Sequence, residues 1–132
     1  MKIQNKVTLE LSKDDMKTYG YEVVDAIVDH FATQNEKLPV VSESREEMEK
    51  LFLENAPEKA SDPREVLNFV LKEVMTKSNI VSHPKSYSFV PGPSNYISAM
   101  ADSLASGFNI FSGGWAASPA AAEMEIVAMN LL

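Results

Sequence analysis

Charged residues are confined almost entirely to the first part of this chain, and this asymmetry limits what the sequence can fold into. Residues 1–77 carry 27 of the 31 charged side chains, and residues 78–132 carry four. This charge-poor segment (residues 78–132) also holds four of the five glycines, nine alanines and ten serines. A free-standing small domain carries charged residues over its surface. A charge-poor segment is therefore typical of surface that is covered, by a partner subunit or by a further part of the polypeptide. The alternative is a compact core of small residues.

Net charge and cysteine content exclude several functional classes. The chain carries −7 at pH 7, and an acidic protein repels phosphate backbones, so we expect no nucleic-acid partner. It has no cysteine, which excludes disulfides and thiolate zinc sites and suits a reducing cytoplasm. Residues 103–122 are uncharged over a membrane-spanning length, but Asn109, the Ser-Gly-Gly turn at 112–114 and Pro119 would break a lipid-exposed helix. We therefore expect a cytoplasmic protein without a membrane span.

Five helices are predicted, because apolar residues recur at helical spacing along the chain. The expected helices begin near Ser12, Ser44, Asp62, Asn95 and Ser118. Residues 80–94 hold three prolines and a glycine, and a glycine-containing loop at 109–117 precedes the last helix. The predicted fold class is all-α in this segment, with extended loops. We divide it into a three-helix region at 1–79 and a loop–helix–loop–helix segment at 80–132.

The sequence ends within its last expected helix. That helix opens at Ser118-Pro119, where a capping residue precedes a proline in the first turn. Its apolar spacing continues to Leu131 without a glycine stop or a basic last turn. We interpret the chain as a segment cut from a longer protein.

No constellation of residues indicates a catalytic or metal centre in this chain. Asp25, Asp29 and His30 lie close on the first helix, but a solvated polar face explains them better than a metal site does. There is no Gly-x-Ser-x-Gly elbow and no phosphate-binding glycine loop. We predict no catalytic, cofactor-binding or metal residue here. An α-helical enzyme that uses His30 and His83, the two histidines, is a distant alternative.

Two loops have the character of binding surfaces. The stretch at 87–93, Tyr-Ser-Phe-Val-Pro-Gly-Pro, combines aromatic side chains with two prolines. A rigid apolar loop of this kind suits the wall of a ligand pocket or a subunit interface. Packing into a core explains this stretch about as well. The sole tryptophan, Trp115, follows two glycines in the second loop, where we expect it to be a packing anchor.

These loops resemble the N-terminal region of the pyridoxal-phosphate-dependent group II amino-acid decarboxylases. The shared features are His83-Pro84, Phe-Val-Pro-Gly at 89–92, Ala101-Asp102, Trp115-x-x-Ser118-Pro119 and Glu123-x-Glu125. The likeness is collinear with the first helix, the Leu38-Pro39 break and the Asn55-Ala56-Pro57 step. This group includes the aromatic-L-amino-acid, tyrosine and diaminobutyrate decarboxylases.

The resemblance implies a much longer parent enzyme that acts on an amino acid with pyridoxal phosphate (PLP). This segment would be the N-terminal extension of an aspartate-aminotransferase-type (PLP fold type I) domain, packed on the missing large domain and against its copy in a homodimer. The residues that hold PLP would lie downstream, so we expect this chain alone to bind no cofactor and to be inactive. The alternative is a free-standing helical dimerisation or interaction module without catalysis.

The resemblance also implies two sets of pocket residues. The loop formed by Phe89, Val90, Pro91 and Gly92 would line the substrate pocket of its own subunit. The loop before Trp115 would reach into the pocket of the other subunit through Phe111 and Gly113. Members that act on aromatic amino acids carry a hydroxyl or small side chain at the position of Gly92 and an aromatic ring at that of Gly113. The resemblance therefore does not imply an aromatic substrate.

Overall fold

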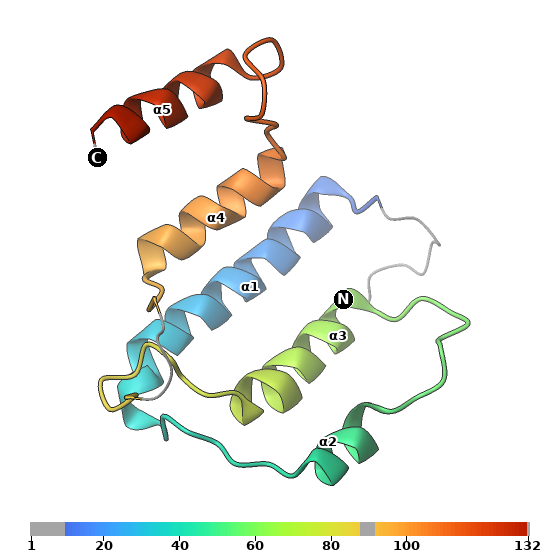
Figure 1. Cartoon of the computed structure of the whole chain (residues 1–132). Coiled ribbons are helices and arrows are strands. Elements are labelled where there is room, and N and C mark those ends of the chain that lie inside the picture. Colours follow the sequence, from blue (N-terminus) through green and yellow to red (C-terminus); the bar gives the residue numbers. More distant parts are fainter. Residues whose placement is uncertain (1–9, 88–91, 132) are drawn as a thin grey trace. The chain divides into compact units, whose positions relative to one another are not determined.

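The computed structural model describes residues 10–87 and 92–131, and within these ranges it contains five α-helices and no β-strand (Figure 1). The α-helices are α1 (Lys13–Thr33), α2 (Arg45–Phe52), α3 (Pro63–Phe69), α4 (Tyr96–Phe108) and α5 (Pro119–Asn130). Three shorter helical segments are η1 (Gln34–Glu36), η2 (Val70–Val74) and η3 (Met75–Lys77). This confirms the predicted all-α class.

The chain divides into two compact units, Met1–Pro93 and Ser94–Leu132. The first unit contains α1, α2 and α3, and the second contains α4 and α5. The division predicted from the sequence, at residue 80, lies before this boundary and stays a prediction. In the structure, the loop after residue 79 is joined to the first unit, because the backbone N–H of Ile80 donates to the carbonyl of Pro39 (2.9 Å).

Side-chain caps fix where α1 and α2 begin. The hydroxyl oxygen of Ser12 accepts the backbone N–H of Asp15 (3.1 Å). Ser44 and Glu47 form a capping box, in which each backbone N–H donates to the other side chain. The Ser44 hydroxyl and N–H both donate to the Glu47 carboxylate, and they hold the pKa of Glu47 below its ordinary value. The predicted helix starts at Ser12 and Ser44 are confirmed.

The third helix changes its winding along its length. It begins at Asp62, whose carboxylate accepts the backbone N–H of Arg64 (2.8 Å), and it continues from α3 through the π-helical η2 into the 3₁₀ turn η3. Glu73 lies within η2 and pairs with Lys77 (2.6 Å) and Lys72 (3.3 Å). These two ammonium groups hold the pKa of the Glu73 carboxyl below its ordinary value.

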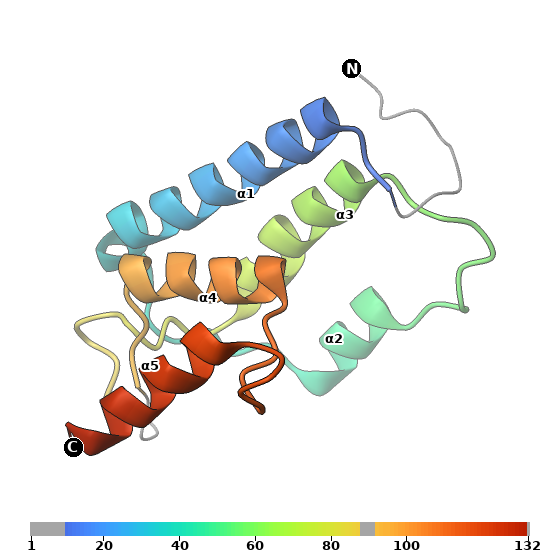
Figure 2. The same ribbon diagram turned by 90° about the horizontal axis from the view of Figure 1, so that it is seen from above.

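The helices of the first unit pack without enclosing an interior. α1 and α3 lie side by side in both views (Figures 1 and 2), and Glu22 of α1 pairs with Arg64 of α3 (3.0 Å). α2 contacts α3 through an edge-to-face pair of rings, Phe52 and Phe69, with centroids 5.9 Å apart. Among the residues that the structure describes, the one buried side chain is His83, which is 5% exposed. The apolar stripe of α1 is only partly covered, with Met16 56% exposed.

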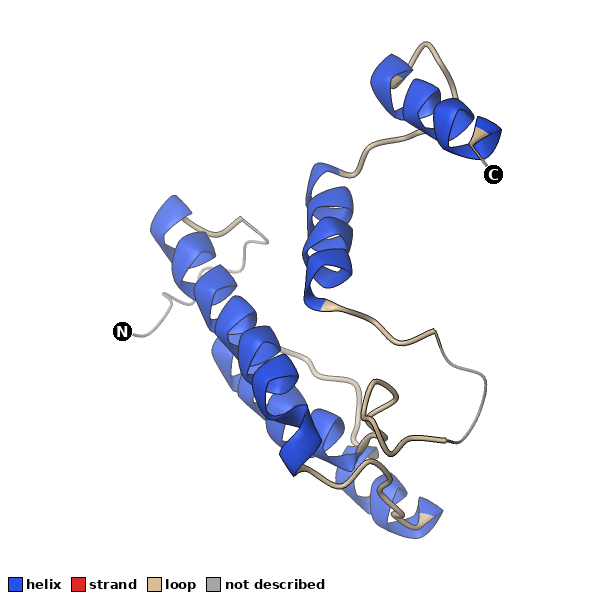
Figure 3. Ribbon diagram, turned by 90° about the vertical axis from the view of Figure 1, so that its left-hand side faces the viewer, coloured by secondary structure: helices blue, strands red, loops and turns tan. Residues whose placement is uncertain are grey.

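The second unit consists of two helices and the loop between them (Figure 3). Asn95 and Ser98 form a capping box at the start of α4, and Asn109 ends that helix in the left-handed region, with φ of 47°. None of the described residues of this unit is buried. Large apolar side chains on both helices are exposed, namely Ile97, Leu104, Phe108, Met124 and Met129. None of the described helices combines the length and the apolar character that a membrane span requires.

Candidate functional site

The predicted pocket residues fall in two parts of the chain. Phe89, Val90 and Pro91 lie outside the residues that the structure describes. Gly92 is exposed in the first unit, and a Cβ added to it would meet no atom within 4 Å. Phe111 and Gly113 belong to the second unit. The lining of one pocket by all six residues stays a prediction.

The structure brings Phe111 and Gly113 together. A Cβ added to Gly113 would lie 2.8 Å from Cζ of Phe111 and 3.1 Å from its Cε2. Carbon atoms in van der Waals contact are about 3.5–4.0 Å apart, so the aromatic ring occupies the space that any side chain at position 113 would need. The Phe111 residue itself is 67% exposed. The loop therefore presents one aromatic ring that lies against a glycine backbone.

The backbone around this ring is held by local hydrogen bonds. The carbonyl of Gly114 accepts the N–H groups of Ala117 (3.1 Å) and Ser118 (3.2 Å), and this turn leads into α5. Trp115 lies within the turn and is 58% exposed. No described part of the second unit encloses Trp115, so its expected role as a packing anchor stays a prediction.

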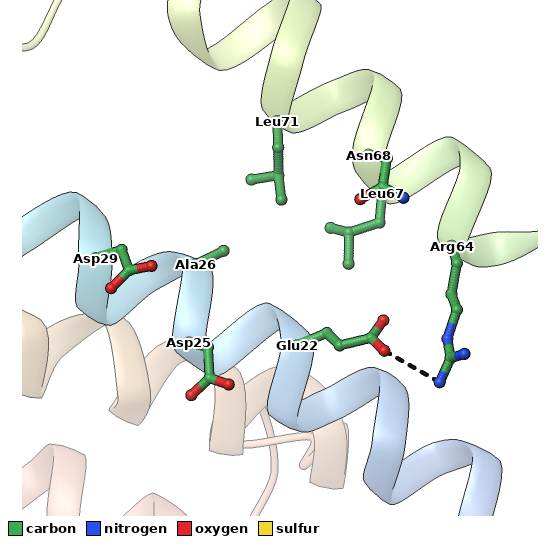
Figure 4. Close-up of a pocket in the computed structure, with 8 residues that line it drawn as sticks. All are labelled: Glu22, Asp25, Ala26, Asp29, Arg64, Leu67, Asn68 and Leu71. Atoms are coloured by element: carbon green, nitrogen blue, oxygen red, sulfur yellow. Dashed lines mark ion pairs between the residues drawn. The ribbon is translucent and has the colours of Figure 1, made fainter.

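A groove between α1 and α3 is a second candidate site, which the sequence did not reveal (Figure 4). Its volume is about 380 Å³. The residues that line it are Glu22, Asp25, Ala26 and Asp29 from α1, with Arg64, Leu67, Asn68 and Leu71 from the third helix. The three carboxylates of α1 share one face, because positions three and four apart are neighbours on a helix. The sequence offers no pattern that pairs residue 22 with residue 64.

The groove is acidic, since three carboxylate residues and one guanidinium group line it. The ion pair of Glu22 and Arg64 is partly exposed, and such a pair contributes about 0–1 kcal/mol. Asp25 and Asp29 line the groove, but His30 is not among its lining residues, and its ring contacts that of Phe31 at a centroid distance of 5.4 Å. In the described part of the chain, no three acidic, histidine or cysteine side chains form a metal-binding group.

The chain is similar to known decarboxylases along nearly its whole length. It is 38% identical over 124 residues to an aromatic-L-amino-acid decarboxylase of Bacillus atrophaeus, and the match covers 94% of this chain and 26% of that protein. It is 25% identical over 122 residues to tyrosine/DOPA decarboxylase 5 of Papaver somniferum, which covers 92% of this chain and 23% of that protein. No protein-family model matches the chain.

The fold is similar to that of a solved structure. The Oryza sativa protein TDC, solved with PLP and tryptamine, matches 95% of this chain with a TM-score of 0.82 and 22% sequence identity. The match covers 26% of that protein, so this chain spans about a quarter of the length of its relatives. These similarities confirm the predicted resemblance to the N-terminal region of a group II PLP-dependent decarboxylase.

Proposed function

We propose that this chain is the N-terminal dimerisation and substrate-pocket-wall segment of a PLP-dependent amino-acid decarboxylase. The observation that carries the proposal is the 38% identity over 94% of the chain to a decarboxylase of which it spans 26%. The natural polypeptide would then be about four times as long as this chain. Its substrate would be an amino acid, and its compartment the cytoplasm.

The exposed apolar helices of the second unit support the dimerisation role. A soluble monomer seldom exposes a large contiguous apolar surface, whereas homodimer interfaces are rich in such side chains. Leu104 is 63% exposed and Phe108 is 74% exposed, one helical turn apart on α4. We assign this surface to contact with the second copy of the chain and with the large domain that would follow.

The cofactor would be held by chain outside this segment. When bound, PLP acts as the electron sink for the bond that breaks as carbon dioxide leaves. The α1–α3 groove does not suit it, because three acidic residues line the groove and would repel the cofactor phosphate, and no lysine lines it. The contribution of this segment is to shape the substrate pocket and to exclude water, with Gly92, Phe111 and Gly113 as its described wall residues.

The proposal is tested by comparing the 132-residue chain with the natural polypeptide. An antibody raised against the chain should detect a band several times larger than 14.6 kDa in the source cells. The longer protein, supplied with PLP, should release carbon dioxide from an amino acid, and the 132-residue chain should release none. Decarboxylation by the purified short chain, or a longer protein inactive on every amino acid, would contradict the proposal.

The exposed surface of the second unit also fits a free-standing helical interaction module. In that case the natural polypeptide would run at 14.6 kDa and would associate without any catalytic activity. The mass of the natural polypeptide therefore separates the two functions.

A further inference from the structure

His83 is the one side chain that the described part of the structure buries, and it is polar. It is 5% exposed, whereas every described apolar side chain is at least partly exposed. Histidine is rarely the most buried residue of a helical unit, because its ring nitrogens need hydrogen-bond partners. The reason for its burial is therefore to be found in those hydrogen bonds.

Three hydrogen bonds of the loop after the third helix meet at His83. Its backbone N–H donates to the carbonyl of Ile80 (3.1 Å), and its own carbonyl accepts the N–H of Ser86 (2.9 Å). Its ring atom Nδ1 accepts the backbone N–H of Lys85 (2.9 Å). An acceptor side chain that bonds the N–H two residues on is the arrangement of an Asx turn, here made by an imidazole.

The turn that His83 closes is attached to the end of α1. The N–H of Ile80 donates to the carbonyl of Pro39 (2.9 Å), and the hydroxyl of Ser82 donates to the side-chain carbonyl of Gln34 (2.5 Å). The direction of the chain at Ser86 is thus fixed relative to a 21-residue helix.

The two ring nitrogens of His83 have different surroundings. Nδ1 accepts a hydrogen bond, so the proton of the neutral ring is on Nε2. Nε2 is buried and has no hydrogen-bond partner among the residues that the structure describes. An unpaired buried donor weakens a fold, so the hydrogen bond at Nδ1 is the contact that explains a histidine at this position.

We infer that His83 is a positioning residue: through Nδ1 it holds the turn at residues 83–86, which precedes Gly92, a residue that we propose to line the substrate pocket. The inference rests on the proposed function. The residue touches neither substrate nor cofactor, and it acts through the backbone of Lys85.

Two substitutions separate the acceptor from the ring. His83→Asn keeps an acceptor at the position of Nδ1, because the Asn carbonyl bonds the N–H two residues on, but it removes the ring. His83→Phe keeps a buried ring and removes the acceptor. Hydrogen exchange of the Lys85 amide is measured by NMR on the 132-residue chain. We expect exchange within about threefold of wild type for His83→Asn and at least about tenfold faster for His83→Phe.

The same variants in the longer protein report on substrate positioning. We expect His83→Phe to raise KM at least about fivefold with kcat changed less than about twofold, and His83→Asn to restore KM. Equal effects of both variants, the reverse order, or a lost Lys85 bond with unchanged KM would each overturn the inference. If the wild-type longer protein has no decarboxylase activity, the proposed function fails, and the exchange rates still decide whether Nδ1 holds the turn.

Discussion

Leu104 provides the sharpest test of the assignment of the second unit as covered surface. The residue lies on α4, is 63% exposed in the single chain, and belongs to the charge-poor segment. Leu104→Glu places a charge where we expect contact with a second copy. Because the side chain is exposed in the monomer, the substitution should leave the helix content of the chain unchanged.

The magnitude follows from the area that the contact would remove from water. Full burial of a leucine side chain contributes about 1.5–3 kcal/mol, so burial of the 63% that is exposed contributes roughly 1–2 kcal/mol per protomer. A symmetric dimer contains two copies of this contact, so its loss costs about 2–4 kcal/mol. The dissociation constant should rise between about thirtyfold and several hundredfold, and an unpaired buried charge adds to this.

The assay is sedimentation equilibrium of the 132-residue chain, with circular dichroism as the measure of helix content. Ser106→Glu is the matched control, because Ser106 is an exposed residue of the same helix two positions away and so points to the opposite side. The control should associate as the wild type does. Association of Leu104→Glu with wild-type affinity, or equal weakening by both variants, would refute the reasoning.

Three further predictions concern stability. The pKa of Glu73 is lowered, so its pairing with Lys77 stabilises the fold above the ordinary glutamate pKa and is lost as pH falls through the pKa of the folded state. On acidification, the helix content of Glu73→Gln should therefore fall less than that of the wild type, and identical acid profiles would contradict the role of Lys77. Asn109→Gly should raise the free energy of unfolding by less than about 1 kcal/mol, because glycine adopts a φ of 47° without strain, and Asn109→Val should lower it. Urea unfolding checks that the glycine variant is the most stable and the valine variant the least. Phe69→Leu should lower the free energy of unfolding by about 0.5–1.5 kcal/mol beyond the effect of lost buried area, since it removes the edge-to-face contact with Phe52. A double-mutant cycle between the two positions that shows no coupling would disprove that contact.

The sequence predicted the local features of the fold well, because these depend on neighbouring residues. Caps at Ser12 and Ser44 mark helix starts through hydrogen bonds that span three positions, so both starts are visible in the order of residues alone. The change of the third helix to a π segment at Val70–Val74 was not predicted, since its apolar spacing continues across the change.

The features that depend on distant residues were not predictable in the same way. The burial of His83 requires a turn attached to Pro39 and Gln34, more than forty residues earlier. The α1–α3 groove similarly requires Arg64 to meet Glu22. Phe111 and Gly113 were found through the resemblance to a family, but the packing of that ring against that glycine depends on a side-chain rotamer that no spacing rule encodes.

The apolar helices α4 and α5 also affect how an unassembled copy behaves in a cell. In the described part of the second unit, twelve large apolar side chains are exposed. Chaperones bind this kind of surface, and it also drives aggregation when it stays uncovered. If a second copy and the large domain cover these helices, as we propose, a copy without that cover would be retained by chaperones, aggregate or be degraded. The supply of the covering surface would then limit the amount of protein that accumulates.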